Sequence, residues 1–170
     1  MFNFIPLIIR VLKLERFKCR SLTAGEIALC QSVFGSLIDY TQVKIMNHPY
    51  LPWQSKHVVM APCGYIHARS PHYSHDYSQE SRAYQGLFIH EMAHIYQYQQ
   101  NINVLLRGAL LQSAFFLSLG KYNPYKYRLK ADKPYFDYNI EQQGDIARDI
   151  FFKRIDNIII QTAGKPKKLK

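Results

Sequence analysis

Apolar residues recur every three or four positions in four stretches of the chain, which is the pattern of helices with one buried face. The first predicted helix covers residues 24–37, and Ser21 or Thr23 can cap its N-terminus. The side chains expected to be buried on this helix are Ile27, Cys30, Val33, Phe34 and Leu37.

The second and fourth helical stretches mix apolar with polar residues. Residues 79–99 are predicted to form a long helix that Ser78 caps. Glu80 falls in its first turn, where a negative charge favours the helix dipole. The last predicted helix covers residues 138–153.

The third stretch, residues 104–119, is apolar almost throughout. Arg107 and Gln112 interrupt it, and it is too short to cross a bilayer, which takes roughly 20 apolar residues. The pattern therefore predicts a core helix rather than a membrane span.

Short strands are predicted between the first two helices. Residues 43–77 are rich in proline, glycine and β-forming residues, and "VKIM", "HVVMA" and "YIHAR" are separated by turn signals. Because helices outnumber strands, we expect an α+β domain, mostly helical, with a small antiparallel sheet ahead of the 79–99 helix.

The chain of 170 residues is expected to form one domain, residues 21–160, between two basic ends. Residues 1–20 are predicted to be a basic amphipathic segment, packed rather than lying on a membrane, and residues 161–170 a disordered tail. The N-terminal apolar stretch is too short to span a bilayer, and charge follows it rather than precedes it. No cleavable signal peptide is therefore predicted.

The composition is strongly basic, with a formal net charge of +10. Basic residues cluster in the N-terminal segment, in residues 121–133 and in the tail, which suits contact with an acidic polymer or an anionic surface. A solvated face with a disordered tail is the other interpretation. Nucleic-acid binding rests on charge and aromatic residues in "KYNPYKYRLK" alone, so no specific nucleic acid is expected. Cys19, Cys30 and Cys63 form no disulfide framework; free thiols are expected, with one disulfide left open.

The segment "HEMAH" carries the clearest chemistry. His90 and His94 are four residues apart, so on a helix both imidazoles face one side and can bind a single ion. Glu91 directly follows His90, so on the helix it lies beside the two histidines. From this position a general base can contact a metal-bound water. The alternative is a pair of core histidines without a metal.

A third metal ligand is needed, and no histidine follows His94 in the sequence. Glu141 and Asp145 are four residues apart on the last predicted helix, with Glu141 placed 47 residues after His94. In zincins with a glutamate ligand, this pair supplies the third ligand and a carboxylate that holds a ligand histidine. An ordinary solvated helix face is the other interpretation.

Stabilisation of a transition state usually requires a donor opposite the metal. Candidates are Tyr138, Tyr127 and Tyr125 ahead of the Glu141 helix, and His75 with Tyr77 ahead of the HEMAH helix. Most of these side chains are expected to serve packing instead.

Four segments, "LTAGEIALCQSVFGSLIDYTQVKI", "MAPCGYIHA", "LFIHEMAHIYQYQQ" and "YNIEQQGDIARD", resemble in this order the bacterial Vgr-related zinc metallopeptidases. That family is similar to the HExxH domain of contractile-injection and toxin-associated proteins, and the resemblance covers residues 21–153. It implies a zincin-like fold with one Zn²⁺ held by His90, His94 and Glu141, and Glu91 as general base. It also implies a link to type VI secretion.

The resulting hypothesis is a zinc-dependent hydrolase that cleaves a peptide or a peptidoglycan stem-peptide amide. The main alternative is a non-catalytic zinc-binding accessory factor of the secretion machine that binds cell wall. Work on the cell wall places the protein in the periplasm, by uncleaved or non-classical export, or in the cytoplasm before secretion.

Overall fold

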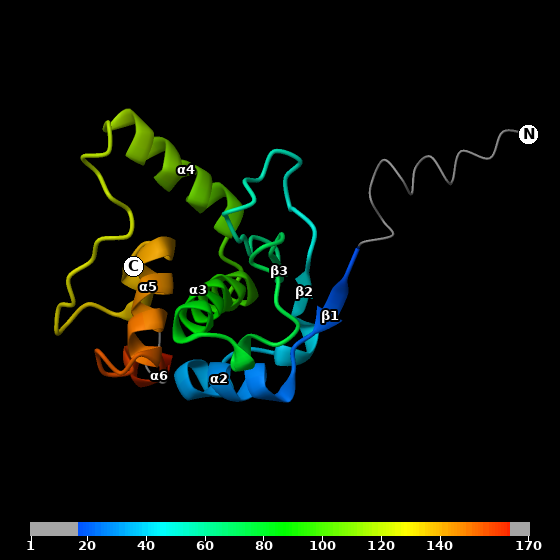
Figure 1. Ribbon diagram of the computed structural model, residues 1–170. Coiled ribbons are helices and arrows are strands. Elements are labelled where there is room, and N and C mark those ends of the chain that lie inside the picture. Colours follow the sequence, from blue (N-terminus) through cyan, green and yellow to red (C-terminus); the bar gives the residue numbers. More distant parts are fainter. Residues whose placement is uncertain (1–16, 164–170) are drawn as a thin grey trace, which may run out of the picture.

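The computed structural model describes residues 17–163 and has the predicted α+β architecture (Figure 1). The predicted N-terminal segment and C-terminal tail fall mostly outside these residues. The elements are β1 (Cys19–Ser21), α2 (Ala24–Phe34), β2 (Lys44–Met46), β3 (Tyr65–His67), α3 (Arg82–Gln99), α4 (Val104–Leu117), α5 (Ile140–Phe151) and α6 (Ile158–Ala163). Short 3₁₀ helices cover Tyr40–Gln42, Tyr77–Gln79 and Tyr135–Asp137.

The predicted sheet exists but is mixed rather than antiparallel. Its order is β1-β2-β3, and β1 pairs with β2 antiparallel, with Cys19 opposite Met46. Strand β3 runs parallel to β2, because a long connection between them lets the chain return in the same direction. The predicted strand "HVVMA" contributes only an isolated bridge from Met60 to His67.

Helix α2 starts where a local signal predicts it. The Thr23 side chain accepts a hydrogen bond from the Glu26 amide, and the Glu26 carboxylate accepts one from the Thr23 amide, which is a capping box. The helix ends at Phe34, before Gly35, whose positive φ of 55° suits glycine. Three of the five side chains predicted to be buried, Cys30, Val33 and Phe34, are fully buried, while Ile27 and Leu37 are half-buried.

Helix α3 starts three residues later than predicted. Ser81 is the cap, since its side chain accepts a hydrogen bond from the Tyr84 amide. Ser78 instead lies in the preceding 3₁₀ helix, where its amide and hydroxyl both donate to Asp76. The chain therefore makes an extra turn before α3 begins.

Helix α3 runs through the centre of the molecule, with α2, α5 and the sheet around it (Figure 1). Every residue from Phe88 to Gln97 is buried, including the polar ones. Its partner is chiefly α5, and Gly86 permits part of this approach because a Cβ there would lie 2.5 Å from the Phe152 ring. The core thus brings the HEMAH segment against the helix of Glu141.

Helix α4 is not the core helix that its composition predicts. Val104 is its only buried residue, and most of its leucines and phenylalanines are exposed. It lies along one edge of the molecule (Figure 1), so only one narrow side can pack against the body. Within the described residues, no helix is long and apolar enough to cross a membrane.

Candidate metal centre

Helices α3 and α5 bring His90, His94 and Glu141 together. The Glu141 Oε2 atom lies 3.4 Å from His90 Nε2 and 3.8 Å from His94 Nε2. One ligand atom from each of the three residues lies within 4.8 Å of the others. Two imidazole nitrogens and a carboxylate oxygen in this arrangement could hold a metal ion.

The second ring nitrogen of His90 is held by the other predicted carboxylate. His90 Nδ1 lies 3.0 Å from Asp145 Oδ1, and Arg148 Nη2 lies 3.0 Å from the same oxygen. This contact favours a proton on Nδ1 and leaves Nε2 free to bind a metal. Burial opposes protonation of His90, but its hydrogen bonds to Asp145 and Glu141 raise its pKa to about 9.

The second ring nitrogen of His94 is held by residues that the sequence analysis did not identify. His94 Nδ1 lies 2.9 Å from Gln97 Oε1, and Gln97 Nε2 donates to the Ile140 carbonyl and to Gln143 Oε1, each at 3.0 Å. Gln143 in turn donates to the Tyr138 carbonyl. The spacing of three between His94 and Gln97 is the signal that could have found the first contact. Burial and the neighbouring His90 lower the pKa of His94, which favours the neutral, ligating form.

Gly144 is a second residue that the sequence analysis missed. A Cβ at this position would lie 2.5 Å from His90 Cε1 and 2.6 Å from His90 Nε2. The imidazole therefore packs directly on the backbone of α5, between Glu141 and Asp145. A glycine inside an otherwise helical pattern is the sequence signal for such a close approach.

Glu91 lies at the same site, and one of its carboxylate oxygens has no hydrogen-bond partner among the described residues. The residue is 5% exposed, and the oxygen without a partner is the buried Oε2 atom. Burial raises the pKa of its carboxyl to about 8; His90 opposes this shift and Glu141 adds to it. A buried carboxylate oxygen without a partner is costly, and this one belongs to the residue next to the ligand His90. The donor set and this orphan oxygen both fit a metal ion with an exchangeable water.

Four of the five candidate donors, Tyr138, Tyr127, His75 and Tyr77, make other contacts, and the Tyr77 hydroxyl donates to the His72 carbonyl. The Tyr138 hydroxyl donates to the Arg128 carbonyl, and the Tyr127 hydroxyl donates to the Asp149 carboxylate. The exposed His75 ring lies 3.3 Å from Lys18 Nζ.

Tyr125 is the tyrosine beside Glu141. Burial and then the nearby carboxylates, Glu141 first, raise the pKa of its hydroxyl to about 12. The phenol of Tyr125, rather than that of Tyr138 or Tyr127, thus lies next to the ligand cluster.

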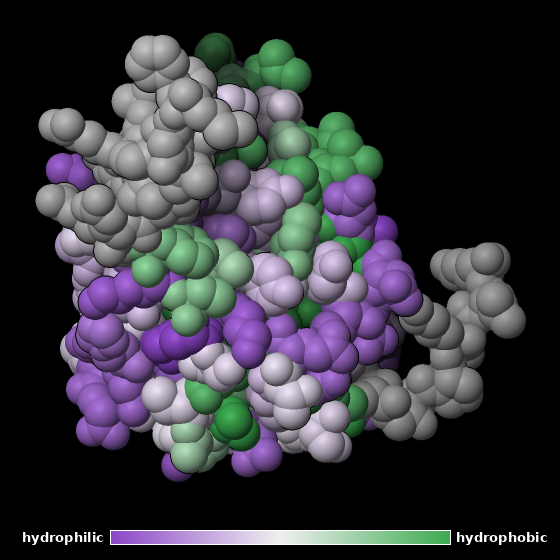
Figure 2. Space-filling model, turned by 90° about the vertical axis from the view of Figure 1, so that its right-hand side faces the viewer, coloured by the Kyte–Doolittle hydropathy of each residue, from purple (hydrophilic) through white to green (hydrophobic). Residues whose placement is uncertain are grey.

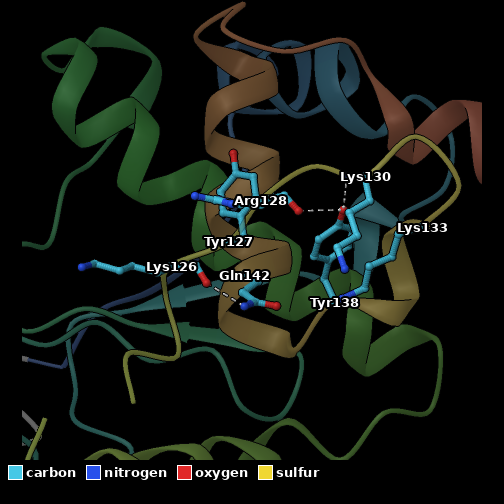
Figure 3. A pocket seen from close by; sticks show the side chains of 7 residues that line it. All are labelled: Lys126, Tyr127, Arg128, Lys130, Lys133, Tyr138 and Gln142. Atoms are coloured by element: carbon cyan, nitrogen blue, oxygen red, sulfur yellow. Dashed lines mark hydrogen bonds between the residues drawn. The ribbon is translucent and has the colours of Figure 1, made fainter. Parts of the chain in front are cut away.

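A basic pocket of about 420 Å³ borders α5 on the side of Gln142 (Figure 3). Its wall consists of Lys126, Tyr127, Arg128, Lys130, Lys133, Tyr138 and Gln142. Lys130 and Lys133 lie beside the Tyr138 ring, while Lys126 points away from them (Figure 3). Gln142 donates to the Lys126 carbonyl at 2.8 Å, which fixes this loop against α5 next to Glu141.

No protein-family model matches the sequence. The type VI secretion system spike protein VgrG2b of Pseudomonas aeruginosa is 50% identical over 136 residues, which are 79% of this chain and 13% of that protein. This chain therefore spans only a small part of the length of that relative. The solved structure of the effector domain of Pseudomonas aeruginosa VgrG2b is 47% identical, with a TM-score of 0.73. The match covers 85% of this chain and 82% of that domain.

Proposed function

The chain belongs to the family of the VgrG2b effector domain, and from this premise we propose that it is a zinc-dependent peptidase of bacterial type VI secretion. The observation that carries the proposal is the buried Glu91 oxygen without a partner, next to His90, His94 and Glu141. A purely structural metal site would not need a buried carboxylate beside it.

The proposed ligands are His90 Nε2, His94 Nε2 and Glu141, a set that is typical of catalytic zinc sites with one open position. When bound, zinc supplies a Lewis acid that polarises a carbonyl and lowers the pKa of water. Asp145 and Gln97 hold the two imidazoles in orientation through their Nδ1 atoms.

Glu91 is the proposed general base. Its free Oε2 can accept a proton from the attacking water, and the same carboxyl can then donate this proton to the leaving amine nitrogen. The overall reaction adds one water across the amide bond. The Tyr125 hydroxyl, half-exposed beside Glu141, is the proposed donor to the developing oxyanion.

The proposed substrate is a peptide or the stem-peptide amide of peptidoglycan, an acidic polymer that suits the net charge of +10. The link to type VI secretion rests on the relative VgrG2b, which is a type VI secretion system spike protein. The alternative is a non-catalytic accessory factor, in which the zinc only holds α3 and α5 together. Two experiments distinguish this alternative from the peptidase.

The first experiment measures zinc per chain in the wild type and in the His94→Ala and Glu141→Ala variants. We expect one zinc in the wild type and loss in both variants. The matched control is Glu91→Gln, which should keep the metal and the fold, since this residue is not a proposed ligand.

The second experiment digests peptidoglycan sacculi, and separately a peptide library, with mass analysis of the fragments. The wild type should release fragments cut at amide bonds, and Glu91→Gln should lose this activity by at least about a hundredfold. Full activity in Glu91→Gln would refute the proposed general base. No activity from either protein, with zinc bound, would favour the accessory factor.

A further inference from the structure

Helix α4 presents an apolar face that nothing in the described structure covers. Leu110 is 61% exposed, Leu117 is 85% exposed and Leu119, just after the helix, is 88% exposed. Leu105, Leu106 and Phe116 add to the same exposed surface. In Figure 2, which keeps the vertical axis of Figure 1, hydrophobic surface gathers at the height of α4.

The exposed residues follow the helical repeat. Leu106, Leu110 and Leu117 are spaced by four and seven residues, so they share one side of α4. The opposite side contacts the body, where a Cβ on Gly108 would lie 3.7 Å from Ile140. The outer side of α4 thus carries a continuous row of large apolar side chains, and burying these side chains away from water would be strongly favourable.

The charged residues of α4 and of the sequence segments on either side of it are all basic. From residue 92 to residue 131 the sequence contains no aspartate or glutamate. The same stretch carries Arg107, Lys121, Lys126, Arg128 and Lys130. Within residues 17–163, the ion pairs involve none of these five side chains. Their charge is available to a negatively charged partner.

The length of α4 limits what that partner can be. Its 14 residues span about 21 Å at 1.5 Å per residue, which is less than the roughly 30 Å of a bilayer core. Apolar helices of this length are usually core helices or lie at a membrane interface. Exposure excludes the core position here, and the charge of the neighbouring residues favours a membrane interface over a contact with a second, equally basic copy.

We propose that α4 together with residues 119–130 docks on the surface of an anionic lipid bilayer. The leucines and Phe116 enter the boundary between headgroups and acyl chains, and the basic side chains contact the lipid phosphates. Tyr122, which is 40% exposed, sits at the level of the headgroups, which tyrosine favours. Every charged side chain of α4 and of residues 119–130 is basic, which matches a negatively charged layer.

The test is co-sedimentation of the full chain with vesicles of phosphatidylcholine alone or with added phosphatidylglycerol. We expect binding to the anionic vesicles, weakened by high salt, and little binding to the neutral ones. The apolar variant Leu110→Ser/Leu117→Ser should lower the partition coefficient by about tenfold or more. The charge variant Lys121→Gln/Lys126→Gln should lower it by about fivefold per charge removed.

The matched control is Ile160→Ser, which removes a half-exposed apolar side chain from α6 instead. It should bind vesicles as the wild type does. Far-UV circular dichroism and thermal unfolding check that every variant is folded, which is expected because the substituted side chains are exposed. All variants keep the basic N-terminal segment, so a loss of binding is assigned to α4 and its loop.

Two results would overturn the proposal. One is binding to anionic vesicles that the α4 variants leave unchanged, which would assign it to another part of the chain. The other is absence of vesicle binding. If the wild type then self-associates on size exclusion and Leu110→Ser/Leu117→Ser abolishes this, α4 is an interface between copies of the chain. The test needs no metal or substrate, so it is independent of the proposed peptidase activity.

Discussion

Replacement of Gly144 by alanine tests whether the close packing of α5 on His90 sets the metal site. The new methyl group would lie 2.5 Å from His90 Cε1, whereas ordinary van der Waals contact begins at 3.4 Å. The imidazole or α5 must therefore move by the difference, about 0.9 Å. Metal–ligand distances tolerate only about ±0.2 Å, so this movement should misplace His90 Nε2.

The expected result is a zinc Kd at least about a hundredfold higher than that of the wild type, equivalent to about 2.7 kcal/mol. The metal-free protein should lose about 2 kcal/mol or less in its free energy of unfolding. Overpacking costs about 1–3 kcal/mol, but the helix preference of alanine over glycine returns up to about 1 kcal/mol. Zinc affinity by competition with a chelator, and urea unfolding without metal, measure the two quantities separately.

The matched control is Gly108→Ala in α4, where the nearest side-chain atom, Ile140 Cδ1, lies 3.7 Å from the added methyl group. This variant should bind zinc normally and gain up to about 1 kcal/mol in stability. If Gly144→Ala binds zinc as tightly as the wild type, the close approach of α5 has no role in the site and the reasoning is refuted.

Three further outcomes are expected. Gln97→Leu should raise the zinc Kd about tenfold and destabilise the protein by about 2 kcal/mol. The reason is that His94 Nδ1 and the buried Ile140 carbonyl lose their hydrogen-bond partner. Normal zinc affinity in a metal titration would contradict this. Arg20→Met should lower the free energy of unfolding in urea by about 3 kcal/mol, since Glu26 is fully buried and 2.7 Å from that guanidinium. The exposed Arg154→Met should change it by less than about 1 kcal/mol, and equal effects would argue against the role of burial. Removal of zinc by a chelator should lower the melting temperature of the wild type. The free energy of unfolding should fall by about 4 kcal/mol if the free zinc concentration was a thousand times its Kd. An unchanged melting temperature would mean that no metal is bound to the folded state.

The sequence alone predicts much of the local structure, because the signals for it lie within a few residues of one another. Thr23, one of the two caps that the sequence offered, starts α2 with a capping box to Glu26, whereas the helix ends at Phe34 before Gly35, three residues earlier than predicted. The start of α3 was predicted three residues early, since Ser78 and Ser81 are both suitable caps. Only the contact of Ser78 with Asp76 in the folded chain decides between them.

The sheet and α4 show where local pattern is insufficient. Strand direction depends on how the chain crosses between β2 and β3, which no spacing of apolar residues records. The composition of α4 is that of a buried helix, yet the body offers it only a narrow contact along Gly108. Whether a helix is buried depends on how much apolar surface the other elements of the fold leave available for contact with it.

For the candidate site, the sequence by itself determined which side chains can act together on one helix. The spacing of four puts His90 and His94 on one face and likewise Glu141 and Asp145, because the helix repeat is a local property. The tertiary structure decided that these two faces meet, with Gly144 under the His90 ring and Gln97 behind His94. The contacts of His90 with Asp145, and of Gln97 with Ile140 and Gln143, join residues more than forty positions apart, and only the packing of α3 on α5 determines them.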